Sequence, residues 1–330
     1  MSKPRILFMG TPAFAVPALQ GLVRCGYPVI GVVTQPDRPQ GRGRATAPPP
    51  VKILAENLNL PLLQPEKVRE PPFLDTFRRL APDLVIVAAF GRILPGEIIH
   101  APREGCINIH PSLLPKYRGA APINWALIRG EQTTGVTIMR MDEGVDSGVI
   151  LLQEETLIGP EETFGELHDR LAILGAEMLI KTLEMLAAGT VRPRPQDHNL
   201  ATLAPRLDRE AGLIRWENDC RAIVSLIRGL SPVPCAYTWL DGKKLKVFTA
   251  AAEPATIAEA PGTIAGETPG AVRVTAGNGY VLLKEVQLEG KKRMAVRDFL
   301  RGCRVVPGQT LGLDENAPSL YPSPRRGREG

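Results

Sequence analysis

The chain has 330 residues, of which 44% are hydrophobic, and its formal net charge of +5 gives a sequence pI of about 9.0. The length is enough for a sizeable core and two domains, whereas the longest apolar runs, such as residues 84–90, are too short to span a bilayer. No charged-then-apolar leader opens the sequence, and we expect a cytoplasmic protein that acts as a monomer and does not contact a membrane.

The first half of the chain alternates between apolar runs typical of buried strands and amphipathic stretches typical of helices. Strands are predicted over residues 5–9, 29–34 and 84–89, and helices over residues 16–24, 51–57 and 73–80. This alternation predicts an α/β fold with a doubly wound, mostly parallel sheet. The turn at residues 10–15 lacks the G-x-G-x-x-G spacing, so we exclude a nicotinamide cofactor.

The boundary between two domains is predicted after a long helix. Apolar residues recur at helical spacing from residue 163 to residue 186, and Gly189 then ends the helix. A Pro-rich basic connector follows at residues 191–196. We therefore divide the chain into a first domain over 1–189, a linker over 190–207, a second domain over 208–313 and a disordered tail over 314–330.

The second domain is predicted to be a small, mostly antiparallel β domain. A helix is expected over 222–228, and short strands over 237–240, 245–250, 272–275 and 280–286, with hairpin turns at Asp241-Gly242 and Asn278-Gly279. Residues 208–313 hold 15 Lys and Arg against 11 Asp and Glu, whereas residues 1–189 hold 19 against 20. This excess indicates a polyanionic partner such as RNA, and a solvated basic face is the alternative.

Asn108 and His110 are the candidate catalytic residues of the first domain. They lie two apart in a predicted strand, so their side chains leave the same face, and Pro111 ends the strand where ligands bind in such folds. Asp142, Glu143 and Asp146 compete for the role of a carboxylate partner. An amide, an imidazole and a carboxylate are the groups needed to move an acyl unit onto an amine; a turn cap, a structural histidine and a loop cap are the alternatives.

Residues 108–119 and 141–148 resemble the 10-formyltetrahydrofolate-dependent formyltransferases. The likeness extends to residues 6–12, 34–39, 119–123 and 135–139, and in the second half to residues 261–263 and 305–308. It implies that the first domain is a formyltransferase domain and that the second is an OB-like β-barrel that binds tRNA. Among the three carboxylates, the resemblance selects Asp146.

The resemblance implies transfer of the formyl group from 10-formyltetrahydrofolate, a co-substrate, to the α-amino group of methionine on initiator tRNA. Asn108 and charged His110 would stabilise the tetrahedral oxyanion, while Asp146 orients His110 and helps to move the proton. Two alternatives stay open: formylation of a small amine or an amino sugar nucleotide, and a non-catalytic RNA-binding protein. The second alternative leaves Asn108, His110 and Asp146 unexplained.

Two groups of residues are expected to bind the folate. The loop of Ser112, Leu113, Leu114 and Pro115 resembles the folate-binding loop of the family, and leucines exposed beside a strand end suit the wall under a flat pterin ring. Phe90, Ile93 and Leu94 are predicted to share that wall, with core packing as the alternative. No metal is expected, because no His, Cys or carboxylate cluster has ligand spacing.

Basic residues in two regions are expected to contact tRNA. The resemblance implies that a Gly- and Pro-rich loop carrying Arg38, Arg42 and Arg44 approaches the acceptor end; a plain mobile loop is the alternative. In the second domain the candidates for phosphate contacts are Lys243, Lys244, Lys246, Lys291, Lys292 and Arg293.

Overall fold

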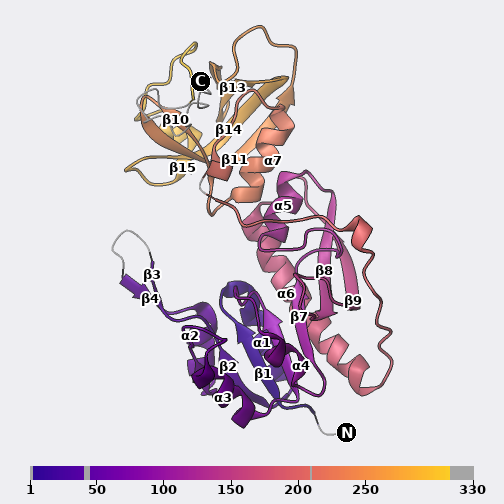
Figure 1. Cartoon of the computed structure of the whole chain (residues 1–330). Coiled ribbons are helices and arrows are strands. Elements are labelled where there is room, and N and C mark those ends of the chain that lie inside the picture. Colours follow the sequence, from indigo (N-terminus) through magenta and orange to yellow (C-terminus); the bar gives the residue numbers. More distant parts are fainter. Residues whose placement is uncertain (1–2, 41–44, 209, 313–330) are drawn as a thin grey trace, which may run out of the picture. The chain divides into compact units, whose positions relative to one another are not determined.

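The computed structural model describes residues 3–40, 45–208 and 210–312 and divides into two compact units (Figure 1). The first unit runs to Arg206, apart from Leu127–Gly130, which belongs with the second unit that begins at Leu207. Residues 190–206, most of the predicted linker, therefore cluster with the first unit.

A seven-stranded sheet forms the centre of the first unit, in the order β5-β2-β1-β6-β7-β8-β9. The first five of these strands are parallel, and the last two pairings are antiparallel. The predicted mostly parallel sheet is confirmed. The strands are β1 (Ile6–Gly10), β2 (Val29–Val33), β5 (Leu62–Leu63), β6 (Leu84–Ala88), β7 (Cys106–His110), β8 (Thr133–Arg140) and β9 (Ile150–Leu157).

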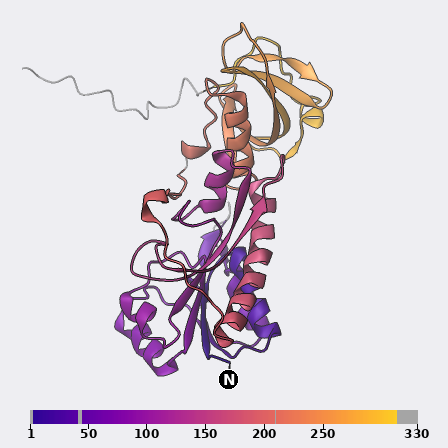
Figure 2. The ribbon, with the colours of Figure 1, turned by 90° about the vertical axis from the view of Figure 1, so that its right-hand side faces the viewer.

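Helices cover both faces of this sheet (Figure 2). On one face lie α1 (Val16–Arg24) and α6 (Phe164–Ala187), which contact each other; α6 also contacts β7, β8 and β9. On the other face, α3 (Pro71–Leu80) and α4 (Gly96–His100) pack against β1, β6 and β7 in one apolar cluster. The remaining helices are α2 (Pro50–Asn57), α5 (Pro122–Ile128) and the 3₁₀ turns η1 (Ala13–Ala15) and η2 (His198–Leu200).

Local sequence explains why α6 begins and ends where it does. Thr163 is its N-cap and forms a reciprocal capping box with Glu166, which satisfies donors of the first turn. The helix ends at Ala187, and Gly189 follows with a φ of +67°, a conformation that glycine adopts at little cost. The predicted helix over 163–186 is thus found within one residue at each end.

A separate two-stranded hairpin leaves the first unit after β2. It consists of β3 (Arg38–Gln40) and β4 (Ala45–Ala47), which pair antiparallel (Figure 1). Arg38 lies at its start and is exposed. Arg42 and Arg44, the other arginines predicted to approach tRNA here, lie outside the described residues.

The second unit is an antiparallel β structure with the strand order β10-β11-β14-β13-β12, and β15 pairs with β14. Its core combines the inner face of the strands with Ile223, Ile227 and Leu230 of α7. This arrangement is consistent with the OB-like domain expected from the resemblance. The elements are η3 (Glu210–Gly212), α7 (Cys220–Leu230), β10 (Ala236–Leu240), β11 (Lys243–Pro254), β12 (Ile264–Thr268), β13 (Ala271–Ala276), β14 (Gly279–Leu288), β15 (Met294–Ala295) and α8 (Val296–Phe299).

One of the two predicted hairpin turns is shifted by one residue. Asp241 and Gly242 form the turn between β10 and β11 with φ values of +47° and +70°. A two-residue turn of type I′ requires a positive φ at both of these positions. Between β13 and β14, however, Ala276 pairs with Gly279, so the turn residues are Gly277 and Asn278. Gly277 has no room for a side chain, because a Cβ there would lie 2.3 Å from the backbone oxygen of Glu217.

Candidate active site

The structure places Asn108 and His110 at the carboxyl end of β7, in the middle of the sheet. All five residues of β7 are buried, and Asn108 and His110 are 9% and 4% exposed. The strand alternation sends Ile109 to the opposite face, where it meets Gly175 of α6. Two polar side chains are thus held side by side by a rigid strand.

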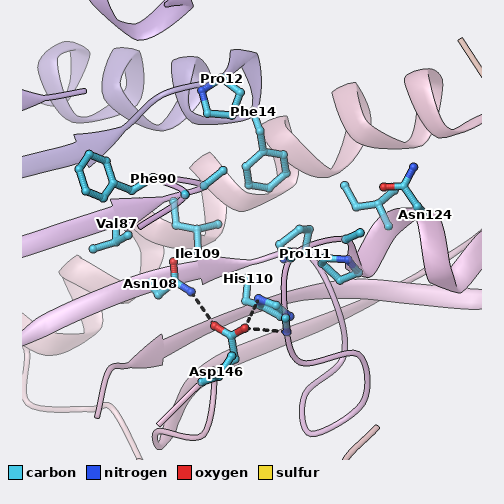
Figure 3. A pocket seen from close by; sticks show the side chains of 18 of the residues that line it. Pro12, Phe14, Val87, Phe90, Asn108, Ile109, His110, Pro111, Asn124 and Asp146 are labelled. Carbon is cyan, nitrogen blue, oxygen red and sulfur yellow. Dashed lines mark hydrogen bonds and ion pairs between the residues drawn. The ribbon is translucent and has the colours of Figure 1, made fainter. Parts of the chain in front are cut away.

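The carboxylate of Asp146 faces both of these side chains (Figure 3). Asn108 Nδ2 donates to Asp146 Oδ1 at 3.3 Å, and Asp146 Oδ2 lies 3.6 Å from His110 Nδ1. Asp146 Oδ2 also accepts a hydrogen bond of 2.9 Å from the backbone N–H of Gly119. The amide, the imidazole and the carboxylate therefore meet at one edge of the sheet.

The other two carboxylates of the loop after β8 lie elsewhere. Asp142 Oδ1 accepts from the backbone N–H of Gly144 at 3.1 Å and from Ser147 Oγ at 2.7 Å, so Asp142 is the residue that caps the loop. The side chain of Glu143 is 76% exposed and lies near His100. Of the three candidates, Asp146 is the carboxylate beside His110.

The imidazole of His110 is fixed through its second nitrogen. His110 Nε2 lies 2.9 Å from the backbone oxygen of Tyr117. Because a carbonyl only accepts hydrogen bonds, Nε2 carries a proton in this arrangement. In the neutral ring, Nδ1 is then the nitrogen with the lone pair, and it is the one beside Asp146.

These three residues line a cavity of about 670 Å³ within the first unit (Figure 3). Its walls come from the segments that follow the parallel strands β1, β6 and β7, at the edge of a doubly wound sheet where ligands bind, from the loop after β8 that carries Asp146 back to this edge, and from the start of α6. The volume suits a small organic ligand. In Figure 3, Val87 and Phe90 lie toward one end of the cavity and Asn124 lies toward the other.

The residues predicted to bind folate fall into two sets. Phe90 and Ile93 line the cavity, and Ile93 is 70% exposed at its rim. Leu94 does not line it, because its side chain is buried in the apolar cluster under α3 and α4. Leu94 therefore has the core-packing position given above as the alternative.

The loop of Ser112, Leu113, Leu114 and Pro115 also lies outside the cavity lining. Leu114, which we expected at the surface, is 3% exposed and packs against Met139 and Ile150. Ser112 is fully buried, and its Oγ donates to the backbone oxygen of Lys116 at 2.7 Å. The expectation of exposed leucines was wrong for Leu114, because the loop folds back onto β8 and β9.

Several cavity residues were missed by the sequence analysis. Phe14, Phe164 and His168 line the side next to α6, with both phenyl rings 5.6 Å from the His168 imidazole. His168 was not among the candidate residues of the sequence analysis. The signal that points to it is its spacing of four from Phe164, which puts both on one side of a helix that begins beside the sheet edge.

Burial sets the protonation state of the Cys106 thiol, which lies in the same strand as Asn108 and His110. Cys106 begins β7, is fully buried, and its Sγ lies 3.4 Å from Met141 Sδ. Burial raises the pKa of the Cys106 thiol far above its usual range. The thiol therefore stays protonated and is not a nucleophile.

The basic residues predicted to contact tRNA in the second unit differ in their surroundings. Lys243, Lys291 and Lys292 are exposed, and Lys246 is half-buried. Lys244 Nζ lies 3.9 Å from the centre of the Tyr237 ring and 5.4 Å from that of Trp239. Arg293 pairs with Glu285 at 2.6 Å and stacks on Phe248, so its charge is largely compensated.

Neither a metal site nor a membrane span is found among the described residues. Within residues 3–40, 45–208 and 210–312 no group of three or more His, Cys, Asp or Glu side chains could hold a metal ion. In the same part of the chain no helix combines the length and the apolar character needed to cross a membrane.

Comparison with known proteins adds an independent finding. Residues 4–183 match the family described as formyl transferase, and residues 206–304 match its C-terminal domain. A methionyl-tRNA formyltransferase of Syntrophus aciditrophicus is 55% identical over 312 residues, which are 94% of this chain and 100% of that protein. A protein of the same name from Geobacter metallireducens is 51% identical with the same coverage.

Solved structures share the fold at lower identity. WlaRD, a sugar 3N-formyl transferase determined in the presence of dTDP and 5-N-formyl-THF, has a TM-score of 0.64 at 17% identity and covers 88% of this chain and 100% of its own. HypX from Aquifex aeolicus, in complex with tetrahydrofolic acid, has a TM-score of 0.62 at 19% identity and covers 91% of this chain and 47% of its own.

Proposed function

The chain belongs to the formyl transferase family, and from this premise we propose that it transfers the formyl group of 10-formyltetrahydrofolate to the α-amino group of methionine on initiator tRNA. The observation that carries the proposal is the 55% identity to a methionyl-tRNA formyltransferase, which extends over both units. The product is the formylmethionyl-tRNA with which translation begins.

The reaction exchanges one bond to the formyl carbon for another. The neutral α-amino nitrogen bonds to this carbon, and the bond between the carbon and N10 of the folate then breaks. The pKa of an α-amino group is about 8, so a useful fraction is neutral at pH 7 without a strong base. The tetrahedral intermediate carries a negative oxygen, and one proton passes from the incoming amine to the departing N10.

Asn108 supplies a donor to the negative oxygen. Its amide has two N–H groups, and the one that contacts Asp146 does so at 3.3 Å, a weak hydrogen bond. The second N–H donates to the oxyanion, which forms only in the transition state and the intermediate. A fixed donor of this kind lowers the barrier because no solvent has to reorganise.

His110 transfers the proton from the amine to N10, and Asp146 stabilises the charged His110 ring during this transfer. The Tyr117 oxygen fixes the ring through Nε2, so Nδ1 takes the proton from the amine and returns it to N10, directly or through water. Asp146, 3.6 Å from Nδ1, stabilises the charged ring that forms in between. The positive ring also stabilises the oxyanion beside it.

The two substrates enter the cavity from different ends. We assign the folate ring to the end formed by Val87, Phe90 and Ile93, because this part of the lining is apolar and Ile93 is 70% exposed at its rim. The methionine side chain then lies toward Phe14 and Phe164, with the formyl carbon at Asn108 and His110 between them.

The tRNA body is assigned to the basic residues of the second unit and to Arg38. Lys243, Lys291 and Lys292 are exposed and fit sequence-independent contacts with phosphates. Tyr237 and Trp239 beside Lys244 add ring faces on which an unpaired base can stack. A small amine or sugar nucleotide would need none of these contacts.

One assay decides between the substrates. The protein is incubated with 10-formyltetrahydrofolate and either methionyl-initiator tRNA, methionyl-elongator tRNA, uncharged tRNA or an amino sugar nucleotide. Formyl transfer to methionyl-initiator tRNA far above the other acceptors supports the proposal. Transfer to the sugar nucleotide alone, or tRNA binding without transfer, would replace it by one of the two alternatives.

A further inference from the structure

The side-chain amide of Gln196 lies between the two chain segments that hold Asp146. Its Nε2 donates to the backbone oxygens of Asp146 at 2.9 Å and of Gly148 at 2.7 Å. Its Oε1 accepts from Nη2 of Arg118 at 2.7 Å and from Nε of the same guanidinium at 3.2 Å. Gln196 is 7% exposed, so little water competes for these bonds.

The segment of Asp146 and the segment of Arg118 both need to be held in place by such hydrogen bonds. Asp146 has a φ of +49°, in the left-handed region that a non-glycine residue rarely adopts and that persists only where the surroundings enforce it. Arg118 directly precedes Gly119, whose N–H donates to the Asp146 carboxylate. The amide of Gln196 thus ties the backbone of Asp146 to the segment that binds its side chain.

The segment around Gln196 also supports His110. Thr202 accepts at its backbone oxygen from the N–H of Arg118 at 2.9 Å, and its Oγ1 accepts from the N–H of Tyr117 at 2.9 Å. Tyr117 in turn holds the His110 ring through its backbone oxygen. Gln196 and Thr202, which the sequence analysis placed in a linker, therefore contact the supports of both catalytic side chains.

We infer that Gln196 is a positioning residue of the transfer reaction. It keeps the loop of Asp146 in register with Gly119, so that the carboxylate stays beside His110 Nδ1 while the proton moves. This inference rests on the proposed function. It predicts that Gln196 acts on turnover rather than on the binding of either substrate.

Two substitutions distinguish the role of the Gln196 N–H donors from the role of the Gln196 side-chain oxygen. Gln196→Glu keeps an acceptor for Arg118 but replaces the N–H donors by an oxygen that faces two carbonyl oxygens. Gln196→Leu removes both ends and leaves the buried guanidinium without its main acceptor, so it also tests the contribution to stability. Asn199→Ala is the matched control, because Asn199 lies on the same segment and is exposed.

The first readout is steady-state formylation of methionyl-tRNA by the full-length variants. Gln196→Glu should lower kcat by about 10- to 100-fold, because a small displacement of a catalytic group is enough for such a loss. Its KM values for the folate and for tRNA should stay within about twofold of the wild type, as should all constants of Asn199→Ala. Melting temperatures are measured alongside.

The second readout does not need activity. Hydrogen exchange at the Gly119 amide reports whether the Asp146 carboxylate still accepts its bond, and it should be faster in Gln196→Glu than in the control. A kcat within about twofold of the wild type in both Gln196 variants would overturn the inference, even if Gln196→Leu melts lower. Unchanged exchange at Gly119 would overturn it as well. If the wild type forms no formylmethionyl-tRNA, the proposed function fails, and the exchange experiment still decides whether Gln196 positions Asp146.

Discussion

The backbone N–H of Gly119 and the carboxylate of Asp146 meet at 2.9 Å, although 27 positions separate them in the chain. Gly119 has a φ of +122°, and a Cβ there would lie 2.7 Å from the backbone oxygen of Ala204, so only glycine can bring its N–H to this point. The carboxylate beside His110 therefore accepts from the backbone a shorter hydrogen bond than the 3.3 Å one from Asn108.

The first prediction concerns the charge of Asp146. Asp146→Asn keeps the shape and an acceptor for Gly119 but removes the charge that stabilises protonated His110, and kcat should fall by about 10²- to 10⁴-fold. Single-turnover formylation and a thermal melt measure the two effects. The melting temperature should stay close to that of the wild type, and Glu143→Gln in the same loop should leave kcat unchanged. Near-normal turnover of Asp146→Asn would contradict the role given to this residue.

Asn108 is predicted to act only on the chemical step. Asn108→Ala removes the oxyanion donor, and kcat should drop by about 10²- to 10³-fold while KM for the folate changes little. Rapid-quench measurement of one turnover separates this effect from product release. A rise in KM with normal kcat would show instead that Asn108 binds the substrate.

The third prediction decides between the two regions proposed for the folate. Ile93→Asp places a charge on the apolar rim of the cavity and should raise KM for 10-formyltetrahydrofolate by about tenfold or more, the effect of losing roughly 1.4 kcal/mol of apolar contact. Leu113→Gln changes the other loop and should leave this KM unaltered. If Leu113→Gln raises this KM and Ile93→Asp does not, the folate binds at the loop of residues 112–115 instead. KM for tRNA serves as the control in both variants.

The sheet and its helices were predictable because their patterns are local. The run Leu84–Ala88 is apolar throughout and is fully buried as β6, and the helix over Val16–Arg24 was predicted with its observed bounds. No strand was predicted for β8 or β9. β9 (Ile150–Leu157) carries Gln153, Glu154 and Glu155 at the edge of the sheet, where one side faces water and strand propensity is a weak guide.

From residue spacing alone, the site was predictable only within one strand, and the family resemblance was needed to select Asp146 among three carboxylates. Asn108 and His110 lie on one strand, so their common face follows from its two-residue period. Asp146 and Gln196 come from segments without regular structure, and 50 positions separate them along the chain. A Pro-rich stretch such as residues 191–196 looks like a spacer because sequence spacing carries no signal for contacts made across the fold.

The fourth prediction concerns the start of α6 and depends on pH. The backbone N–H of Thr163 and its hydroxyl donate to Glu166 and lower the pKa of that carboxyl below its ordinary value of 4.5. A lowered pKa means that the stabilisation is complete above the unfolded-state pKa and is lost as the pH falls through the folded-state pKa. Wild type should therefore exceed Glu166→Gln in stability at pH 7, by less than about 1 kcal/mol, and the difference should be smaller at pH 3, below the ordinary pKa of 4.5. Urea unfolding at both pH values measures it, and Thr163→Ala should be less stable at both.

The fifth prediction concerns the basic residues of the second unit. Lys291 and Lys292 are exposed, so each is able to neutralise a phosphate and release a bound counterion. The double change of Lys291→Glu and Lys292→Glu should raise KM for tRNA and reduce the slope of log KM against log salt by about 1 to 2. At saturating tRNA, kcat should be unchanged.

The control for this experiment has the same change in net charge. Arg79→Glu with Arg103→Glu alters residues just before β6 and β7, at the edge of the sheet opposite the cavity. If general electrostatic attraction were the cause, the control would reduce the salt slope as much as the lysine variant does. If Lys291 and Lys292 touch the tRNA, the control keeps a slope near that of the wild type. Equal slopes in all three proteins would remove Lys291 and Lys292 from the tRNA contact, because a phosphate contact cannot be lost without a loss of salt dependence.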